Sequence, residues 1–254
     1  MSIGSSLGEW LVVIPARLAS ERLPRKPLQD LGGKPLIVRV RENLLPLERS
    51  GARVVVATDH EDIVKACAQF GYEAVLTKSS HPSGTDRCHE VASRFEYPFI
   101  LNVQGDEPFV HIGDLMALMT AMKARPEIPM GSLVYDSGDL SDYTSPNVVK
   151  AVRSNEGVAI YFSRSPIPYD RDTRNGDIGL CRFWQHLGVY GFRREALQKF
   201  CAMPPGLLEK REKLEQLRVV EAGWKIWLEP ASRASLGIDT PQDLEAARAT
   251  IKAK

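Results

Sequence analysis

The first half of the chain alternates short apolar runs with amphipathic segments. Each apolar run has the length of a strand, and each amphipathic segment has the length and spacing of a helix. Strands are expected at residues 10–14, 53–57, 73–76 and 99–103, and helices at residues 35–47, 61–70, 86–95 and 112–123. Because the apolar runs are nearly continuous, we expect strands buried on both faces of a parallel, helix-covered sheet.

The second half changes character, because polar, turn-rich connections separate its strands. Strands are expected at residues 132–135, 148–153, 158–162 and 186–192, and helices at residues 207–222 and 241–251. Thr240 is a predicted N-cap of the last helix, with Pro241 at its first position. We expect an antiparallel or mixed extension of the same sheet, within one domain spanning residues 1–254, and a mobile surface loop at Asp170–Phe183.

Composition narrows the class of protein. The 254 residues carry 33 Lys and Arg against 32 Asp and Glu, so the chain has no bulk charge favouring nucleic acid or a membrane surface. The four cysteines are too far apart for a CxxC pair, which predicts neither a zinc site nor a disulfide framework. The start of the chain lacks a signal-peptide pattern, and no apolar run is long enough to span a bilayer. We therefore expect a cytoplasmic protein.

Polar segments follow the predicted strands, at the strand ends where open α/β sheets bind ligands. The segment IPARLASERLPRKPL places Arg17, Arg22, Arg25 and Lys26 directly after the first strand. Converging cations suit a polyanion such as a triphosphate. A solvated basic loop is the alternative, and the segment matches neither the Walker A pattern nor GxGxxG.

Two carboxylates and one small-residue turn are further candidates. Asp106 follows a strand in NVQGDEP, and Asp239 precedes the final helix, so the pair could hold Mg²⁺, although either residue alone suits a turn or a helix start. The Ser83–Arg87 segment, SGTDR, either donates backbone N–H groups to a ligand or caps a helix. The histidines lack metal-binding spacing and GxSxG is absent, so no nucleophile is predicted.

Together these segments resemble the 3-deoxy-manno-octulosonate (Kdo) cytidylyltransferases, or CMP-Kdo synthetases. The resemblance runs from Val12 to Glu245 through the motifs VVIPARLASERLPRKPL, VVVATDHEDI, SGTDR, NVQGDEP, SPNVVK, YFSRSPIP, HLGVYGFR, LEQLRVVEAG and GIDTPQDLE. It implies a Rossmann-like, glycosyltransferase-A-like nucleotidyltransferase fold whose mixed sheet is mostly parallel in the first half. It also implies the reaction of CTP with Kdo to give CMP-Kdo and pyrophosphate, with Mg²⁺, for lipopolysaccharide inner-core synthesis by a homodimer.

The resemblance also implies roles for parts of the chain. Residues 1–130 would form the nucleotide-binding half, residues 131–235 the β-rich sugar-binding and dimerisation half, and residues 236–254 the metal-binding turn and closing helix. Catalysis would rest on Lys26 with Asp106 and Asp239, the two aspartates holding Mg²⁺.

Binding roles follow from the same motifs. The triphosphate would be held by Arg17, Arg22 and Lys26. The cytidine would be bordered by Pro15, Ala16, Ser83, Gly84, Thr85 and Arg87, with Gln104 where nucleotide and sugar meet. The sugar acid would be bound by Arg164, His186, Tyr190, Glu215 and Gln216. Without the resemblance, His186 and Tyr190 are also explained as residues of a packed strand. Glu215 and Gln216 are also explained as residues of a polar helix face.

Some choices remain open. Arg25 stands where the family motif usually has Gly, and it either contacts phosphate or faces solvent. The sugar acid could be 8-amino-Kdo or a sialic acid, but sialic-acid enzymes resemble a motif with Gly-Gly-Ser where this chain has Leu18-Ala19-Ser20. A non-catalytic nucleotide-binding module on the same fold is the alternative from another class. Both metal carboxylates are present, which disfavours it, and the charged strand ends disfavour a purely structural interaction protein.

Overall fold

The computed structural model describes residues 7–169, 171 and 182–252, which fall into two compact units. The first unit comprises Met1–Ile112 and Ser235–Lys254, and the second comprises Gly113–Ala234. The first boundary lies before the division predicted at residue 130, because α5 (Ile112–Ala124) packs with the second unit.

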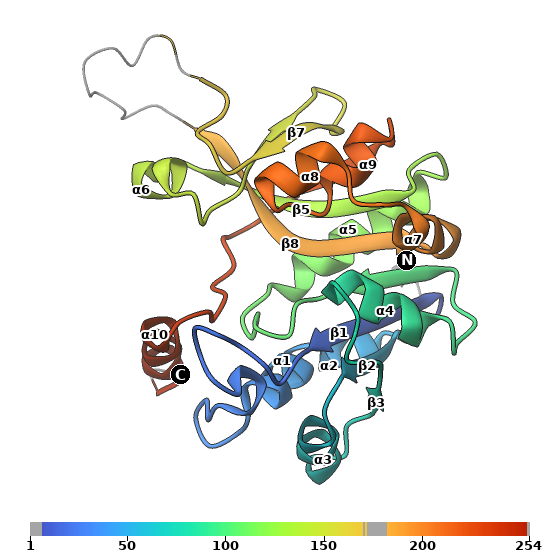
Figure 1. Ribbon diagram of the computed structural model, residues 1–254, viewed down its shortest axis with the longest axis vertical. Helices are drawn as coiled ribbons and strands as arrows, with labels where there is room; N and C mark the ends of the chain where they lie inside the picture. Colours follow the sequence, from blue (N-terminus) through green and yellow to red (C-terminus); the bar gives the residue numbers. More distant parts are fainter. Residues whose placement is uncertain (1–6, 170, 172–181, 253–254) are drawn as a thin grey trace, which may run out of the picture. The chain divides into compact units, whose positions relative to one another are not determined.

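The first unit is a parallel sheet with the strand order β3-β2-β1-β4 (Figure 1). Its strands are β1 (Trp10–Ala16), β2 (Arg53–Thr58), β3 (Ala74–Leu76) and β4 (Phe99–Asn102). Its helices are α1 (Leu36–Asn43), α2 (Leu45–Arg49), α3 (Glu61–Gln69), α4 (Gly84–Ala92) and α10 (Pro241–Lys252). Every residue of β1 is buried, as its continuous apolar run predicts.

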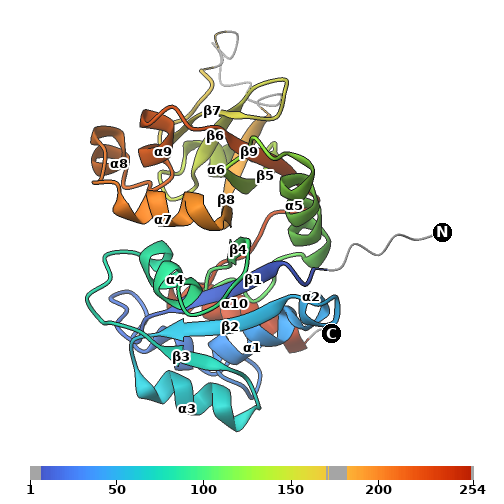
Figure 2. The same cartoon turned by 90° about the vertical axis from the view of Figure 1, so that its right-hand side faces the viewer.

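The chain changes direction across this sheet between β1 and β4. It runs outward from β1 through β2 to β3, then returns through α4 to β4 on the other side of β1. Because such crossovers are right-handed, α4 lies on the opposite face of the sheet from α1 and α3 (Figure 2). Connections therefore diverge at the carboxyl ends of β1 and β4, where open α/β sheets bind ligands.

The second unit holds a mixed sheet. Its strands are β5 (Met130–Ser137), β6 (Lys150–Arg153), β7 (Ala159–Ser163), β8 (Phe183–Arg193) and β9 (Ile226–Ala231). Strand β5 pairs antiparallel with β8 and parallel with β9, while β6 pairs antiparallel with both β8 and β7. The remaining helices are α6 (Leu140–Thr144), α7 (Arg194–Ala202), α8 (Leu207–Glu212) and α9 (Leu217–Glu221).

The structure confirms the parallel first half and the mixed second half, but it breaks two predicted helices. The helix predicted at 35–47 divides at Leu44, because Pro46 in the first turn of α2 cannot donate an N–H to a continuous helix. The helix predicted at 207–222 ends early because Lys213 takes a left-handed conformation, with φ 54°. Strand β9 and helices α6 and α7 were not predicted.

One prediction falls mostly outside the described residues. Of the loop predicted at 170–183, Asp170 and residues 172–181 lie outside the part of the chain that the structure describes, and Phe183 begins β8. Within that described part, no helix combines the length and apolar character needed to cross a membrane.

Candidate active site

A pocket of about 500 Å³ lies at the carboxyl ends of β1 and β4, within the first unit. Pro15 and Ala16 end β1 and form one wall, while Gln104, Gly105 and Asp106 follow β4. Gly105 allows these segments to approach closely, since a Cβ there would lie 2.6 Å from the Pro15 carbonyl oxygen. The topology therefore places the pocket at the predicted strand ends.

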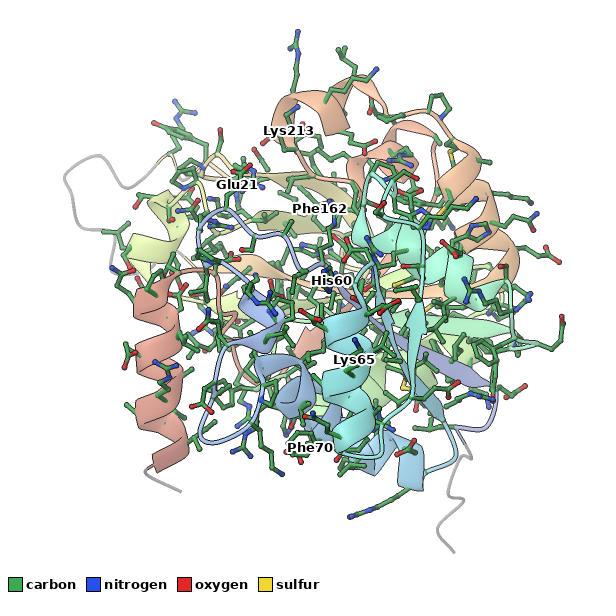
Figure 3. The ribbon with its side chains drawn as sticks, turned by 60° about the horizontal axis from the view of Figure 1, so that its bottom comes forward. Glu21, His60, Lys65, Phe70, Phe162 and Lys213 are labelled. Carbon is green, nitrogen blue, oxygen red and sulfur yellow. The ribbon has the colours of Figure 1, made fainter. Side chains whose placement is uncertain are left out.

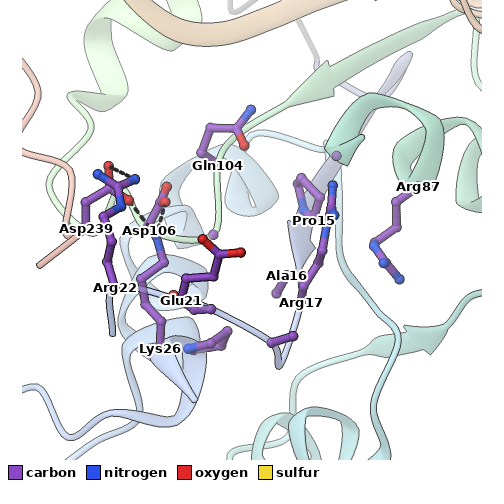
Figure 4. Close-up of a pocket in the computed structure, with 15 residues that line it drawn as sticks. Pro15, Ala16, Arg17, Glu21, Arg22, Lys26, Arg87, Gln104, Asp106 and Asp239 are labelled. Atoms are coloured by element: carbon purple, nitrogen blue, oxygen red, sulfur yellow. Dashed lines mark hydrogen bonds and ion pairs between the residues drawn. The ribbon is translucent and has the colours of Figure 1, made fainter. Parts of the chain in front are cut away.

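Lys26 joins two carboxylates from distant segments in this pocket (Figure 4). Its Nζ lies 2.5 Å from Asp106 Oδ2 and 3.0 Å from Asp239 Oδ1. Burial alone would lower the pKa of Lys26, but the charges and hydrogen bonds of the two aspartates outweigh burial and raise the pKa. The ammonium is therefore charged at neutral pH and holds both carboxylates near one point.

Backbone contacts fix the two aspartates. The Ile238 N–H donates to the Asp106 carbonyl at 2.9 Å, which ties the segment before α10 to the segment after β4. The Asp239 and Thr240 N–H groups both donate to Asp243 Oδ2, and the Asp243 N–H donates to Thr240 Oγ1. This capping box confirms the predicted start of the last helix. It also leaves the Asp239 carboxylate turned toward Lys26.

Two arginines of the loop after β1 also line the pocket. Arg22 Nη2 lies 3.1 Å from Asp239 Oδ2, and both side chains are substantially exposed. Arg17 Nη2 donates to the Pro82 carbonyl at 3.1 Å, next to the predicted nucleotide turn. Arg17, Arg22 and Lys26, the three cations that the family resemblance assigns to a triphosphate, therefore line one pocket.

The oxygen atoms of Asp106 and Asp239 form a donor set suited to Mg²⁺. Both carboxylates contact the same ammonium, so they converge on one point, and Mg²⁺ prefers oxygen ligands with one or two carboxylates. Among the described residues, no group of three or more His, Cys, Asp or Glu could hold a metal ion.

The Ser83–Arg87 turn both caps a helix and reaches the pocket. Ser83 Oγ accepts the Asp86 N–H at 3.1 Å, which confirms the capping interpretation, while Gly84 and Arg87 line the pocket. Thr85 is buried behind it, where its hydroxyl accepts from Asn102 Nδ2. Arg87 is fully buried, which lowers its pKa, and its Nη2 lies 3.3 Å from Asp59.

Two acidic residues of this region were not singled out from the sequence. Glu21 lines the pocket and adds a third carboxylate to it. Glu107 hydrogen-bonds Ser235, and burial, with smaller contributions from Asp106 and Asp239, raises the pKa of Glu107 to about 7. Glu107 could have been singled out from the sequence, because it directly follows the candidate metal ligand Asp106 in NVQGDEP.

Three of the five predicted sugar-acid residues form a buried polar cluster in the second unit. His186 Nε2 lies 2.8 Å from Ser132 Oγ, and Tyr190 donates its hydroxyl to Gln216 Oε1 at 3.1 Å. If Ser132 donates its proton to the Val189 carbonyl at 2.6 Å, its oxygen is left to accept a proton from His186 Nε2. The Gln216 Nε2 atom is buried without a partner among the described residues. Buried polar groups are usually hydrogen-bonded, so this unpaired donor is an exception within the cluster.

The remaining two predicted residues differ from that cluster. Burial, together with the charge of Glu215, raises the pKa of Tyr190, so Glu215 acts on the cluster electrostatically. Arg164 directs its guanidinium at the backbone carbonyls of Glu212 and Pro146, at 2.8 and 2.9 Å. These bonds hold the side chain in place, but they use only part of the five N–H donors of a guanidinium.

Acid is expected to destabilise the protein through His186. Burial lowers the pKa of His186 to about 3, so below the ordinary histidine pKa of about 6.5 the unfolded chain takes up a proton that the folded chain excludes. This contribution to stability is complete above pH of about 6.5, and it falls by up to about 1.4 kcal/mol per pH unit toward pH of about 3.

Urea unfolding of the wild-type protein and His186→Asn measures this effect. The stability advantage of the wild type over the variant should shrink steadily between pH of about 6.5 and 4.5. An advantage that stays constant over this range would show that His186 is not a buried neutral imidazole.

Comparison with known proteins agrees with this geometry. The cytidylyltransferase family model matches residues 11–226. The 3-deoxy-manno-octulosonate cytidylyltransferase of Geobacter sulfurreducens is 43% identical over 240 residues, covering 92% of this chain and 95% of the relative. The enzyme of the same name from Syntrophobacter fumaroxidans is 45% identical over 239 residues, covering 92% of this chain and 93% of the relative.

Solved structures give the same result. A CMP:2-keto-3-deoxy-manno-octonic acid synthetase complexed with CTP matches with a TM-score of 0.89 and 39% identity, covering 96% of this chain and 98% of that chain. A 4-diphosphocytidyl-2C-methyl-D-erythritol synthase from Anaerococcus prevotii is 12% identical with a TM-score of 0.63, covering 96% of this chain and 99% of that chain, and it shares the fold alone. The chain therefore belongs to the cytidylyltransferase family, among the 3-deoxy-manno-octulosonate cytidylyltransferases.

Proposed function

We propose that this protein transfers CMP from CTP to the anomeric hydroxyl of Kdo, giving CMP-Kdo and pyrophosphate. The observation that carries the proposal is the contact of one ammonium, that of Lys26, with the carboxylates of Asp106 and Asp239 beside the arginines of the loop. Nucleotidyl transfer requires positioning and charge stabilisation rather than a protein nucleophile. The identity of the two substrates is inferred from the relatives named for this reaction.

The charges around the pocket support a need for Mg²⁺. Four lining side chains are cations, Arg17, Arg22, Lys26 and Arg87, whereas Glu21, Asp106 and Asp239 are carboxylates. This near balance would bind a triphosphate polyanion weakly by itself. Asp106 and Asp239 would hold the ion, and bound Mg²⁺ would offset charge on the phosphates and on the departing pyrophosphate.

The residues of the chain bind and orient the nucleotide. Arg17, Arg22 and Lys26 would bind the phosphate oxygens, and Pro15, Ala16 and Arg87 would border the cytidine. The sugar hydroxyl oxygen would form a bond to the α-phosphorus in line with the breaking bond to the β-phosphate oxygen. The hydroxyl proton would leave to solvent. These cations would stabilise the transition state by pre-organised charge.

The second unit would recognise the sugar acid. The unpaired Gln216 Nε2 donor and the Tyr190 hydroxyl offer polar groups suited to a polyol. Glu215, His186 and Arg164 would complete this recognition, with the Arg164 cation suited to the carboxylate of the sugar acid. The product would be used in the synthesis of the lipopolysaccharide inner core. The enzyme would act in the cytoplasm as a homodimer.

Pyrophosphate release with Mg²⁺, CTP and Kdo tests the proposal. UTP, ATP, 8-amino-Kdo and N-acetylneuraminate serve as alternative substrates. Release with CTP and Kdo alone is expected. Release only with another sugar acid would contradict the assigned acceptor, and no release with any pair would contradict the enzymatic function.

Asp106→Asn should lower the rate of pyrophosphate release by about 100- to 1,000-fold. The amide keeps the size of the side chain but removes the charge that Lys26 and Mg²⁺ would share. Glu245→Gln is the matched control, because Glu245 is an exposed acid of the same unit that pairs with Arg248 on α10. Comparable rates in both variants would contradict the role of Asp106.

Gln216→Leu should raise the KM for Kdo about 5-fold and leave the KM for CTP unchanged, because one neutral hydrogen bond contributes about 1 kcal/mol. Tyr190→Phe breaks the same Tyr190–Gln216 bond but keeps the amide N–H, so its effect on Kdo should be smaller. Equal effects of the two variants would show that the free amide donor does not bind the sugar acid.

A further inference from the structure

Arg25 is set apart from the other cations of the loop after β1. Arg17, Arg22 and Lys26 line the pocket, whereas Arg25 is not among the lining residues. Its Nη2 instead lies 2.7 Å from Asp62 Oδ2, in the first turn of α3. This hydrogen bond is the main cause of the lowered pKa of Asp62. Arg25 therefore pairs with a carboxylate outside the pocket, a partner that the sequence did not indicate.

The backbone at Arg25 bends the chain between two contacts. Arg25 has φ 52° and ψ 35°, a left-handed conformation that side chains with a Cβ disfavour, and Lys26 follows it at the start of a 3-10 turn, Lys26–Leu28. The Leu28 N–H donates to the Arg25 carbonyl at 2.9 Å. Arg25 thus reaches α3 while the next residue reaches Asp106 and Asp239.

A second carboxylate from the same corner holds the other end of the loop. Asp59 follows β2, and its Oδ1 accepts the Leu18 N–H at 3.2 Å. Asp59 Oδ2 also pairs with Arg87 of the pocket at 3.3 Å. Figure 3 labels Glu21 in the loop and His60 in the corner between the two aspartates. The corner from β2 to α3 therefore binds the loop at residues 18 and 25, on either side of Arg22.

We infer that Arg25 and Asp62 form a clasp that positions the phosphate-binding loop, an inference that rests on the proposed function. The clasp fixes the loop from outside the pocket, so Arg22 and Lys26 are arranged before CTP arrives. Pre-organisation lowers the entropic cost of binding. Arg25 and Asp62 are positioning residues, and their loss should weaken CTP binding without changing the turnover rate or the KM for Kdo.

Asp62→Asn separates this clasp from a simple charge effect. If Arg25 and Asp62 acted on CTP only through space, removing a negative charge near the pocket would strengthen CTP binding. Loss of the clasp weakens it instead. Glu61→Gln is the matched control, since Glu61 lies in the same helical turn but faces Lys65, with a 3.7 Å separation between their charged atoms. It removes the same charge without breaking the clasp.

Calorimetry of CTP binding with Mg²⁺ provides the readout. We expect Asp62→Asn and Arg25→Asn to weaken CTP binding about 2- to 5-fold at low salt, the range for an exposed ion pair. Asparagine tolerates the left-handed backbone at position 25. The difference should shrink at about 0.5 M salt, where exposed charges are screened. The exchanged pair Arg25→Asp with Asp62→Arg should recover affinity that each single reversal loses.

Unchanged or stronger CTP binding by Asp62→Asn would contradict the inferred clasp. It would also be contradicted if the exchanged pair lost as much CTP affinity as the two single reversals together. Amide hydrogen exchange of the free protein keeps the clasp testable even if the proposed function is wrong. Exchange at Leu18–Leu28 should be faster in Arg25→Asn and Asp62→Asn than in the wild type or Glu61→Gln. Equal exchange in all four proteins would contradict the clasp, whereas a wild type that neither binds CTP nor releases pyrophosphate would contradict only the function.

Discussion

The contact of Lys26 with two carboxylates is the interaction on which the pocket depends. Asp106 and Asp239 lie 80 and 213 positions from Lys26 in the sequence, yet both reach its ammonium. Two carboxylates held this close would repel each other without a cation between them. The ammonium therefore stabilises the same close arrangement of carboxylates that a divalent ion requires.

The rest of the first unit serves to hold these three groups in place. The change of direction between β1 and β4 brings the loop of Lys26 beside the segment of Asp106. The backbone bond from Ile238 to Asp106 and the capping box at Thr240 then fix Asp239. The second unit differs, because its predicted sugar-acid residues His186, Tyr190 and Gln216 are buried. Burial keeps His186 neutral, and hydrogen bonds constrain Tyr190, so this cluster is specified by shape and hydrogen bonding.

Local pattern was enough to predict the strands of the first unit and the position of the pocket. Apolar runs marked the buried strands, and the rule that ligands bind at strand ends pointed to Lys26 and Asp106. Lys213 carries no local signal for a left-handed turn, so the break between α8 and α9 was missed. The pairing of Arg25 with Asp62, and of Asp59 with the Leu18 N–H, joins residues far apart in sequence. Such contacts depend on how the elements pack against each other, and the hydrophobic periodicity of the sequence does not determine that packing.

Phosphorus NMR of the purified protein with CTP, Kdo and Mg²⁺ tests the central claim most directly, because it identifies the bond that breaks. In the proposed reaction, the charged groups of the pocket surround a departing pyrophosphate. The CTP signals should give way to pyrophosphate and one phosphodiester in equal amounts, and both products should form about 100- to 1,000-fold more slowly in Asp106→Asn. Release of orthophosphate with CDP, or the same products from Asp106→Asn at the wild-type rate, would contradict the proposed reaction.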